Sequence, residues 1–397
     1  MVISESMLDL VNNSSAVRKM FEEGIRLAAE IGPENVFNFS LGNPSVPAPA
    51  KVADTIRKIL DEMDSLYVHG YMPNAGYPDV RKKVADYLNR CFDAKMTENN
   101  ILMTCGAAGG LNCIMRALLN PGDEVICFAP YFGEYRSYAA NFGGKVVPVP
   151  VGHEDFQLNL EAFPAYVTEK TKAVILNSPN NPTGVIYSAE TLDAFNKLLI
   201  EAEEKIGHPI FVVCDEPYRA LAYDGATVPY MPAYIKNTII GSSFSKTLSL
   251  PGERIGYIAV PSVVDGFDEL MSALVVANRT LGYVNAPSLM QLVAAECLDE
   301  QCDVDAYDRN RQLLYNALLK DGFSCVKPEG AFYLFVKSPV EDDEAFVEAA
   351  KKYGILMVSM KSWGCPGYVR LAYCTSYDMI ERSLPAFEKL AKEYNLI

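Results

Sequence analysis

The amino-acid sequence predicts an α/β protein with two parts: a large domain built on a mostly parallel sheet, and a smaller α+β domain after it. Two observations predict this fold. Short runs that are apolar throughout alternate with longer stretches of helical periodicity, and the pattern changes near residue 287. Continuous apolar runs are typical of strands buried on both faces, and their alternation with helices indicates a parallel sheet covered by helices on both sides.

The predicted strands of the large domain are the apolar runs between residues 101 and 260. Helical periodicity separates these runs, most clearly from Ala189 to Ile206. We expect the large, cofactor-binding domain to cover residues 51–286. Its predicted strands are Ile101–Thr104, Glu124–Phe128, Ala173–Leu176, Ile210–Cys214, Thr238–Gly241 and Tyr257–Val260.

The smaller domain is expected over residues 287–397. A long helical stretch from Pro287 to Lys320 comes first, and a helix-compatible tail starts at Tyr377. Residues 1–50 form an N-terminal arm that ends in several prolines, and we expect this arm to pack with the smaller domain. Between its helical segments, the smaller domain has strand-like runs at Phe332–Val336 and Tyr368–Tyr373.

The composition excludes several classes of protein. The chain has 397 residues, 50% of them apolar and 21% charged, as in a packed globular protein. A net charge of -15 argues against nucleic acid as a partner, because phosphates require a basic surface. No apolar stretch suits a membrane span, and the start of the chain lacks a secretion-signal pattern. The ten scattered cysteines are therefore expected to be reduced thiols of a cytoplasmic protein.

The three histidines disfavour two kinds of site. His69, His153 and His208 do not lie at metal-ligand spacing from one another or from a cysteine, so no metal site is expected. The small number of histidines also disfavours a Ser-His-Asp hydrolase.

Lys246 stands in a segment rich in small hydroxyl residues, Ser242–Gly256, directly after a predicted strand. A lysine amine attacks an aldehyde when its surroundings lower its pKa. Arg254, further along the segment, offers a planar fork of N–H donors for phosphate oxygens. The segment therefore suits a covalent link to an aldehyde beside an anchored phosphate. The alternative is a solvated lysine at the end of a strand.

Other polar residues also follow predicted strands, and ligands of open α/β sheets bind outside the carboxyl ends of the strands. Gly106–Gly110 starts a helix whose backbone N–H groups suit a phosphate, and Asn181 lies among turn-forming residues. Asp215 and Tyr218 follow another strand. Taken singly, each suits an ordinary turn or helix cap. Together with Lys246 they supply the protein groups that a pyridoxal phosphate site needs.

The chain resembles the class I and II aminotransferases, the pyridoxal-phosphate family of aspartate aminotransferase, over essentially its whole length. Ser243–Gly256 resembles the family's lysine signature, and Asn177–Gly184 and Asp215–Tyr218 match two further motifs in order and spacing. The resemblance implies a large domain of the aspartate-aminotransferase type, the cofactor pyridoxal 5′-phosphate and a homodimer. It also implies an enzyme that moves an amino group from an L-amino acid to a 2-oxo acid by a ping-pong mechanism.

The resemblance assigns roles to individual residues as well. Lys246 would join the cofactor aldehyde and carry the proton, Asp215 would pair with the ring nitrogen, and Tyr218 would contact the ring oxygen; these are the expected catalytic residues. The substrate carboxylate would be bound by Gly42, Asn181 and Arg370. The other cofactor-binding residues would be Gly106, Ala107, Ala108, Phe132, Asn181, Ser243, Ser245, Arg254 and, from the neighbouring subunit, Tyr71.

Several alternatives stay open at this point. Many family members carry a hydroxyl residue where this chain has Ala108, so one phosphate hydrogen bond is missing. Arg279 either binds a second substrate carboxylate or forms a salt bridge, which leaves the amino donor undecided. Taken alone, Tyr71 and Phe132 suit a hydrophobic core, and Arg370 suits an ion pair on a strand.

Two other functions match parts of the pattern. A pyridoxal-phosphate-dependent C–S β-lyase on the same scaffold would use Lys246, Asp215 and Arg370 in the same places. A non-catalytic cofactor-binding regulator is disfavoured, because the chain is acidic and begins the aminotransferase pattern almost at once.

Overall fold

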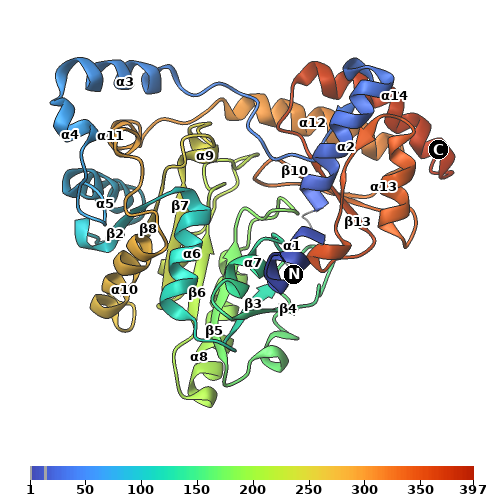
Figure 1. Ribbon diagram of the computed structural model, residues 1–397. Coiled ribbons are helices and arrows are strands. Elements are labelled where there is room, and N and C mark those ends of the chain that lie inside the picture. The colour runs from blue at the N-terminus through green and yellow to red at the C-terminus, as the bar shows by residue number, and fades with distance from the viewer. Residues whose placement is uncertain (1, 13–15) are drawn as a thin grey trace.

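The computed structural model describes residues 2–12 and 16–397 and has a seven-stranded sheet in its larger part (Figure 1). The strand order is β2-β8-β7-β6-β5-β3-β4. Strand β8 is antiparallel to both of its neighbours, whereas the other pairs are parallel, which confirms the predicted mostly parallel sheet. The strands are β2 (Ile101–Thr104), β3 (Glu124–Phe128), β4 (Lys145–Val149), β5 (Thr171–Asn177), β6 (Phe211–Asp215), β7 (Thr238–Ser243) and β8 (Gly256–Ala259).

Different helices cover the two faces of this sheet. Alternate residues of a strand point to opposite faces, so Val125 and Cys127 pack in a core with α6 and α10, whereas Ile126 packs in a core with α8. Helix α8 has the predicted bounds, because the Ser188 hydroxyl accepts a hydrogen bond from the Thr191 N–H at its start. These helices are α6 (Gly106–Leu118), α8 (Ala189–Ile206) and α10 (Phe267–Thr280), and the short helices α7 (Tyr135–Ala140) and α9 (Phe244–Thr247) follow β3 and β7.

A third group of helices packs beside the β2–β8 edge of the sheet, and it corrects one prediction. The stretch from Pro287 to Lys320 is two helices rather than one long helix, since Asp303 caps a new helix by accepting from the Ala306 N–H. The first of the two, α11, packs against α3, α4 and α5. The helices are α3 (Ala50–Glu62), α4 (Ser65–His69), α5 (Pro78–Phe92), α11 (Ser288–Glu296) and α12 (Val304–Lys320).

The smaller part contains a four-stranded antiparallel sheet in the order β12-β13-β10-β9, at the right of Figure 1. Both strand-like runs expected there are strands, β10 and β13, and α12 packs against the C-terminal helix α14. The elements are β9 (Cys325–Val326), β10 (Tyr333–Lys337), α13 (Asp343–Lys351), β12 (Val358–Ser359), β13 (Tyr368–Ala372) and α14 (Tyr377–Glu393).

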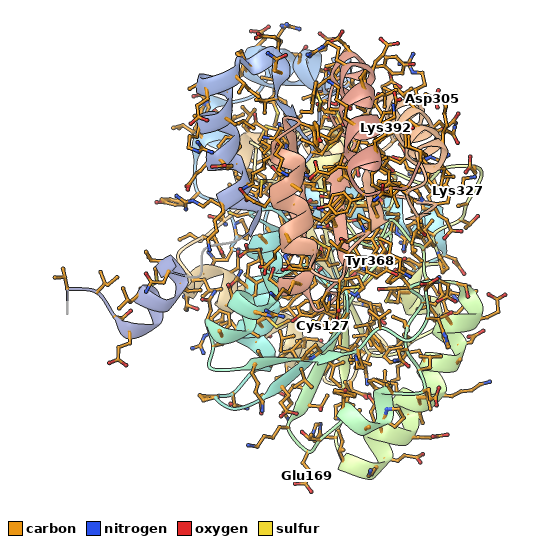
Figure 2. All side chains as sticks on the ribbon, turned by 90° about the vertical axis from the view of Figure 1, so that its right-hand side faces the viewer. Cys127, Glu169, Asp305, Lys327, Tyr368 and Lys392 are labelled. Carbon is orange, nitrogen blue, oxygen red and sulfur yellow. The ribbon has the colours of Figure 1, made fainter. Side chains whose placement is uncertain are left out.

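The N-terminal segment joins the smaller part through backbone pairing. Strand β1 (Phe37–Asn38) lies parallel to β11 (Ile355–Leu356), and helix α2 (Ala16–Ile31) contacts β12. Helix α1 (Glu5–Asn12) projects from the body of the molecule (Figure 2). Among residues 2–12 and 16–397, none of the helices combines the length and the apolar content needed to cross a membrane.

Candidate active site

A cavity of about 1380 Å³ lies at the carboxyl ends of β5, β6 and β7, where the two parts of the molecule meet. This is the edge at which an open α/β sheet binds its ligands. Of the predicted site residues, Gly106 and Tyr71 are the two outside the described cavity lining. The others that line it are Gly42, Ala107, Ala108, Phe132, Asn181, Asp215, Tyr218, Ser243, Ser245, Lys246, Arg254 and Arg370.

Lys246 lies in α9, one turn after the end of β7, and its amine faces the cavity. The Nζ atom donates a hydrogen bond to the Gly42 carbonyl at 2.6 Å, and it lies 5.2 Å from the centre of the Phe332 ring. Burial lowers the pKa of this lysine to about 8, and the positive charges of Arg254 and Arg370 act in the same direction. A neutral, nucleophilic amine is therefore more accessible here than at an exposed lysine.

Asp215 is the last residue of β6 and is buried. Its Oδ2 atom accepts a hydrogen bond from the Tyr135 hydroxyl at 2.6 Å, whereas Oδ1 is buried without a partner among the residues that the structure describes. Burial raises the pKa of the carboxyl to about 6; the Tyr135 hydrogen bond opposes this rise, and Glu216 adds to it. One carboxylate oxygen is thus held and the other is left to accept from a ligand.

Tyr218 and Tyr333 share a hydrogen bond between their hydroxyl groups, 2.8 Å apart. Burial raises the pKa of both phenols, that of Tyr333 to about 12, so both stay protonated at neutral pH. The Tyr333 ring also lies beside Gly42, where an added Cβ atom would collide with its hydroxyl oxygen. A glycine at position 42 is therefore required for this close approach.

Arg370 is a fully buried cation in the middle of β13. Its Nη1 donates to Asn181 Oδ1 at 3.0 Å and its Nη2 donates to the Ser40 carbonyl at 2.6 Å. The guanidinium lies close to two aromatic rings, 4.5 Å from the centre of Tyr333 and 5.0 Å from that of Trp363. Its Nε is buried without a partner within the described part of the chain, so the group retains a donor for a ligand.

The start of α6 and Arg254 meet at the opposite wall of the cavity. Gly106 has a φ of +68°, and an added Cβ atom there would lie 2.7 Å from Arg254 Nη2. Only glycine therefore allows the guanidinium to lie this close to the start of the helix. Ala107, Ala108, Ser243 and Ser245 line the same wall, so exposed backbone N–H groups, hydroxyls and a cation converge there.

A model of the family described as aminotransferase class I and II matches residues 34–387. The chain belongs to this family. An aspartate aminotransferase of Pyrococcus abyssi is 31% identical, with 98% of each chain covered. An aspartate/prephenate aminotransferase of Thermus thermophilus is 31% identical, with 88% of this chain and 89% of that one covered.

Solved structures agree with this assignment. An amino transferase from Eubacterium rectale superimposes with a TM-score of 0.97 at 45% identity, over 100% of both chains. The aspartate aminotransferase of Thermus thermophilus with maleate gives a TM-score of 0.83 at 27% identity, over 95% of this chain and 96% of that one. The fold is thus of the aspartate-aminotransferase type, and the protein is a transaminase of a pyridoxal-phosphate-dependent family. Nothing among these relatives favours the C–S β-lyase.

Three of the remaining predicted residues have clear positions in this aminotransferase. Phe132 lines the cavity and meets the rings of Tyr135 and Trp363 edge to face, at 5.6 Å in each case. Tyr71 is 94% exposed and lies apart from the cavity of its own chain. Arg279 is exposed near the end of α10 and also lies outside the cavity lining.

Sequence reasoning missed three aromatic residues of the aminotransferase site: Tyr135, Tyr333 and Trp363. Tyr333 and Trp363 do not follow a strand of the large sheet, and Tyr135 lies at the start of α7, beyond the residues directly after β3. Trp363 offered one usable clue, because it is the only tryptophan of the chain. Tyr333 stands in a hydrophobic run, which is typical of an ordinary core residue, and Tyr135, between Glu134 and Arg136, has no distinguishing local signal.

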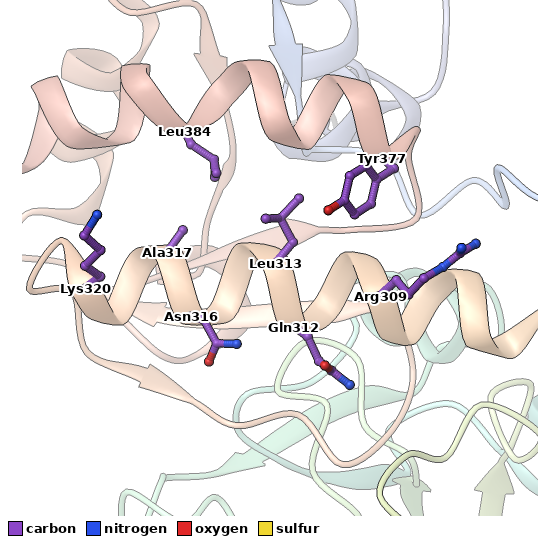
Figure 3. Close-up of a pocket in the computed structure, with 8 residues that line it drawn as sticks. All are labelled: Arg309, Gln312, Leu313, Asn316, Ala317, Lys320, Tyr377 and Leu384. Atoms are coloured by element: carbon purple, nitrogen blue, oxygen red, sulfur yellow. The ribbon is translucent and has the colours of Figure 1, made fainter.

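A second groove of the aminotransferase, with a volume of about 900 Å³, lies between α12 and α14 (Figure 3). Leu313, Tyr377 and Leu384 point into the space between the two helices, whereas Gln312 and Asn316 point away from α14. Among its described lining residues, none has a buried polar atom without a partner. The groove therefore lacks the unpartnered buried polar atoms that Asp215 and Arg370 offer to a ligand in the main cavity.

Proposed function

We propose that this aminotransferase holds pyridoxal 5′-phosphate in the cavity, with Lys246 joined to the cofactor aldehyde and Asp215 paired with the ring nitrogen. The observation that carries the proposal is one cavity that contains a partly buried amine with a lowered pKa and a buried carboxylate with a free oxygen. A lone buried carboxylate oxygen is costly unless a ligand supplies a donor. The protonated ring nitrogen of this cofactor is such a donor.

The opposite wall suits the phosphate of the same cofactor. Arg254 supplies a planar cation, and the first residues of α6, Gly106–Ala108, supply backbone N–H groups at the positive end of the helix dipole. The hydroxyls of Ser243 and Ser245 add donors. Position 108 contributes no hydroxyl because it is alanine, so we expect the backbone and Arg254 to carry this part of the binding.

The substrate carboxylate would be bound by Arg370. Two of the guanidinium nitrogens are held by Asn181 and Ser40, which fixes the plane of the group, and the third nitrogen is free. A fork held in this way recognises a carboxylate with little loss of side-chain entropy. Leu41 and Gly42 line the cavity beside it and would close over the bound carboxylate.

The reaction transfers the amino group of an L-amino acid to a 2-oxo acid in two half-reactions. Bound pyridoxal phosphate supplies an electron sink for the pair of electrons left when the substrate Cα–H bond breaks. Lys246 Nζ would accept the Cα proton and return it later, a general acid–base step that typically contributes ~10²–10⁴ in rate. Asp215 would keep the ring nitrogen protonated, and Tyr218 with Asn181 would donate to the ring oxygen.

A homodimer is part of the proposal. Exposed apolar side chains gather on one stretch of the chain, from the end of α3 through α4 to the following loop; Leu66 is 83% exposed and Tyr71 94% exposed. The others in this stretch are Leu60, Met63 and Tyr67. An apolar stretch of this kind favours burial against a second copy of the chain. Tyr71 would then reach the phosphate in the partner's cavity.

We place the enzyme in the cytoplasm. The ten cysteines of the chain are all free thiols in the structure, and seven of them are buried. Free thiols in this number suit a reducing compartment.

A half-reaction screen tests the proposed function. The purified protein, loaded with pyridoxal phosphate, is mixed with single L-amino acids while the visible absorbance of the cofactor is followed, and the donor that bleaches it fastest names the substrate class. Lys246→Ala should abolish turnover, whereas the exposed control Lys236→Ala should not. Borohydride reduction followed by peptide mapping should place the cofactor on Lys246. An adduct on another lysine would refute the assignment.

A further inference from the structure

The Tyr135 hydroxyl donates to Asp215 Oδ2 at 2.6 Å, and both side chains are buried. Tyr135 opens α7, a helix of the large domain, whereas Asp215 ends β6. The hydrogen bond therefore links two elements that are far apart in the sequence, inside the cavity that holds Lys246.

We propose that Tyr135 is the positioning residue of Asp215: its hydroxyl holds one carboxylate oxygen and so presents the other to the ring nitrogen of the cofactor. This inference rests on the proposed function, since it takes Asp215 as the partner of that nitrogen. Tyr135 would not contact the ring nitrogen itself and would act through the carboxylate.

Several contacts fix the Tyr135 ring in place. The ring meets Phe132 edge to face, with 5.6 Å between the centres and 86° between the planes, and it lies 6.4 Å from the Tyr138 ring. Its backbone N–H donates to the Phe132 carbonyl at 3.1 Å. Since the ring cannot swing away without disturbing Phe132, the direction of the hydroxyl is set by the packing of α7.

Asp215 is held from its other side as well. The Asn177 side chain donates to the Asp215 backbone carbonyl at 2.7 Å, which fixes the end of β6 against the end of β5. With the backbone fixed and Oδ2 bonded to Tyr135, the remaining freedom of the carboxylate is small. Oδ1, which is buried without a partner in the described chain, then has one stable direction.

A tyrosine suits this task because it stays a donor. Burial raises the pKa of Tyr135 well above its usual value, with Asp215 adding to the rise, so the phenol remains protonated over the working pH range. The hydrogen bond stabilises the ionised carboxylate and works against burial, which raises the pKa of Asp215 to about 6. The other ionisable groups that act on this pair are Glu216, Cys214, Tyr218, Tyr138 and Cys127.

The test is Tyr135→Phe, which removes the hydroxyl and keeps the ring contact with Phe132. Without the donor the pKa of Asp215 rises, so the acidic limb of the pH profile of kcat/KM should move up by about one pH unit. The pH below which cofactor affinity falls, measured by equilibrium dialysis, should move in the same direction. The substrate KM at high pH should change little, because Arg370 is untouched.

The matched control is Tyr223→Phe, which removes the hydroxyl of a buried tyrosine whose partner is the Ala331 carbonyl, in the core of the smaller part. It should leave the acidic limb where it is. In an Asp215→Asn background, where position 215 cannot ionise, Tyr135→Phe should no longer move either pH dependence. A shift that persists in that background would assign the effect to another group and overturn the proposal.

A second substitution covers the case in which Tyr135→Phe does not fold. The more acidic phenol of 3-fluorotyrosine at position 135 is a stronger donor and should move the acidic limb to lower pH. An acidic limb that stays in place in both variants overturns the inference while leaving the proposed function intact. Peptide mapping that places the cofactor away from Lys246 would instead overturn the proposed function itself.

Discussion

At the scale of single residues, burial sets the charge states on which the site depends. The pKa of Lys246 falls to about 8 because an ammonium is disfavoured away from water, and the pKa of Asp215 rises to about 6 because a carboxylate is disfavoured there. Both shifts bring the pKa values of these groups closer to neutral pH. Above pH 6 the carboxylate is mostly ionised, and near pH 8 about half of the lysine is a free amine.

The first prediction concerns this lysine. Only the neutral amine attacks an aldehyde, so the rate at which the cofactor-free protein takes up pyridoxal phosphate covalently should rise with pH, by roughly tenfold between pH 7 and pH 9. Stopped-flow absorbance at several pH values measures this rate. Lys246→Ala serves as the blank. A rate that rises by roughly 100-fold over the same range, with no levelling off above pH 8, would mean an ordinary lysine.

The second prediction concerns Arg370. Arg370→Lys keeps the charge and removes the planar fork, so the substrate KM should rise by about 10–100-fold, whereas the affinity for the cofactor should stay the same. Steady-state kinetics and cofactor titration separate the two effects. The control is Arg309→Lys, an exposed arginine in the groove between α12 and α14. Equal losses of substrate and cofactor affinity would contradict the assignment.

At the scale of elements, one buried carboxylate holds the loop that carries Trp363. Asp343, the first residue of α13, accepts through Oδ2 from the Ser359 hydroxyl at 2.8 Å and from two backbone N–H groups, those of Met360 and Lys361. The loop continues to Trp363, which packs on Arg370. The geometry around Arg370 therefore depends on the start of a helix in the smaller part.

The third prediction follows from this loop. Asp343→Ala removes the acceptor of three hydrogen bonds that hold this loop, so the free energy of unfolding should fall by about 1–3 kcal/mol, and the substrate KM should rise because Trp363 is less firmly fixed. Urea unfolding and steady-state kinetics measure the two effects. The neighbouring Asp342→Ala removes only the helix cap and should lower stability by ~1 kcal/mol with KM unchanged. Equal KM values for the two variants would contradict this role of the loop.

The predicted strands show which elements sequence reasoning finds. Glu124–Phe128 and Ile101–Thr104 have the observed bounds of β3 and β2, because strands buried on both faces are mostly apolar. Strand β4 escaped prediction, since it lies at the sheet edge with Lys145 and Pro148 exposed. The prediction of one helix from Pro287 to Lys320 was wrong for another reason. Its break lets Cys302 donate from its backbone N–H to the Thr247 carbonyl beside Lys246, a tertiary contact with no local signal.

At the scale of the whole molecule, the site forms where chain segments far apart in the sequence meet. Gly42 comes from the N-terminal segment, Lys246 from the large sheet and Arg370 from the small sheet. The Lys246–Gly42 and Arg370–Ser40 hydrogen bonds tie the N-terminal segment to both sheets. In the proposed dimer a fourth segment, the loop with Tyr71, is added by the partner.

The fourth prediction tests that contribution. Dimers of Tyr71→Ala should bind the cofactor weakly, and dimers of Lys246→Ala should be inactive. After the two variants are mixed and allowed to exchange subunits, each mixed dimer contains one site with Tyr71 from one chain and Lys246 from the other. Activity at limiting cofactor should therefore reappear in the mixture. Mixing that restores nothing, with exchange verified by mass, would place Tyr71 outside the partner's site.

The sequence by itself determined the family, the mostly parallel sheet and the residues that follow its strands, because strand ends and motif spacing are local features of the chain. Lys246, Asp215, Arg254 and Arg370 could all be chosen in that way, and the structure places them around one cavity. Only the tertiary structure decided what each of them touches. The hydroxyl of Tyr135 on Asp215 and the rings of Tyr333 and Trp363 around Arg370 are contacts between distant segments. Such contacts arise from packing, which brings side chains together regardless of their order in the sequence.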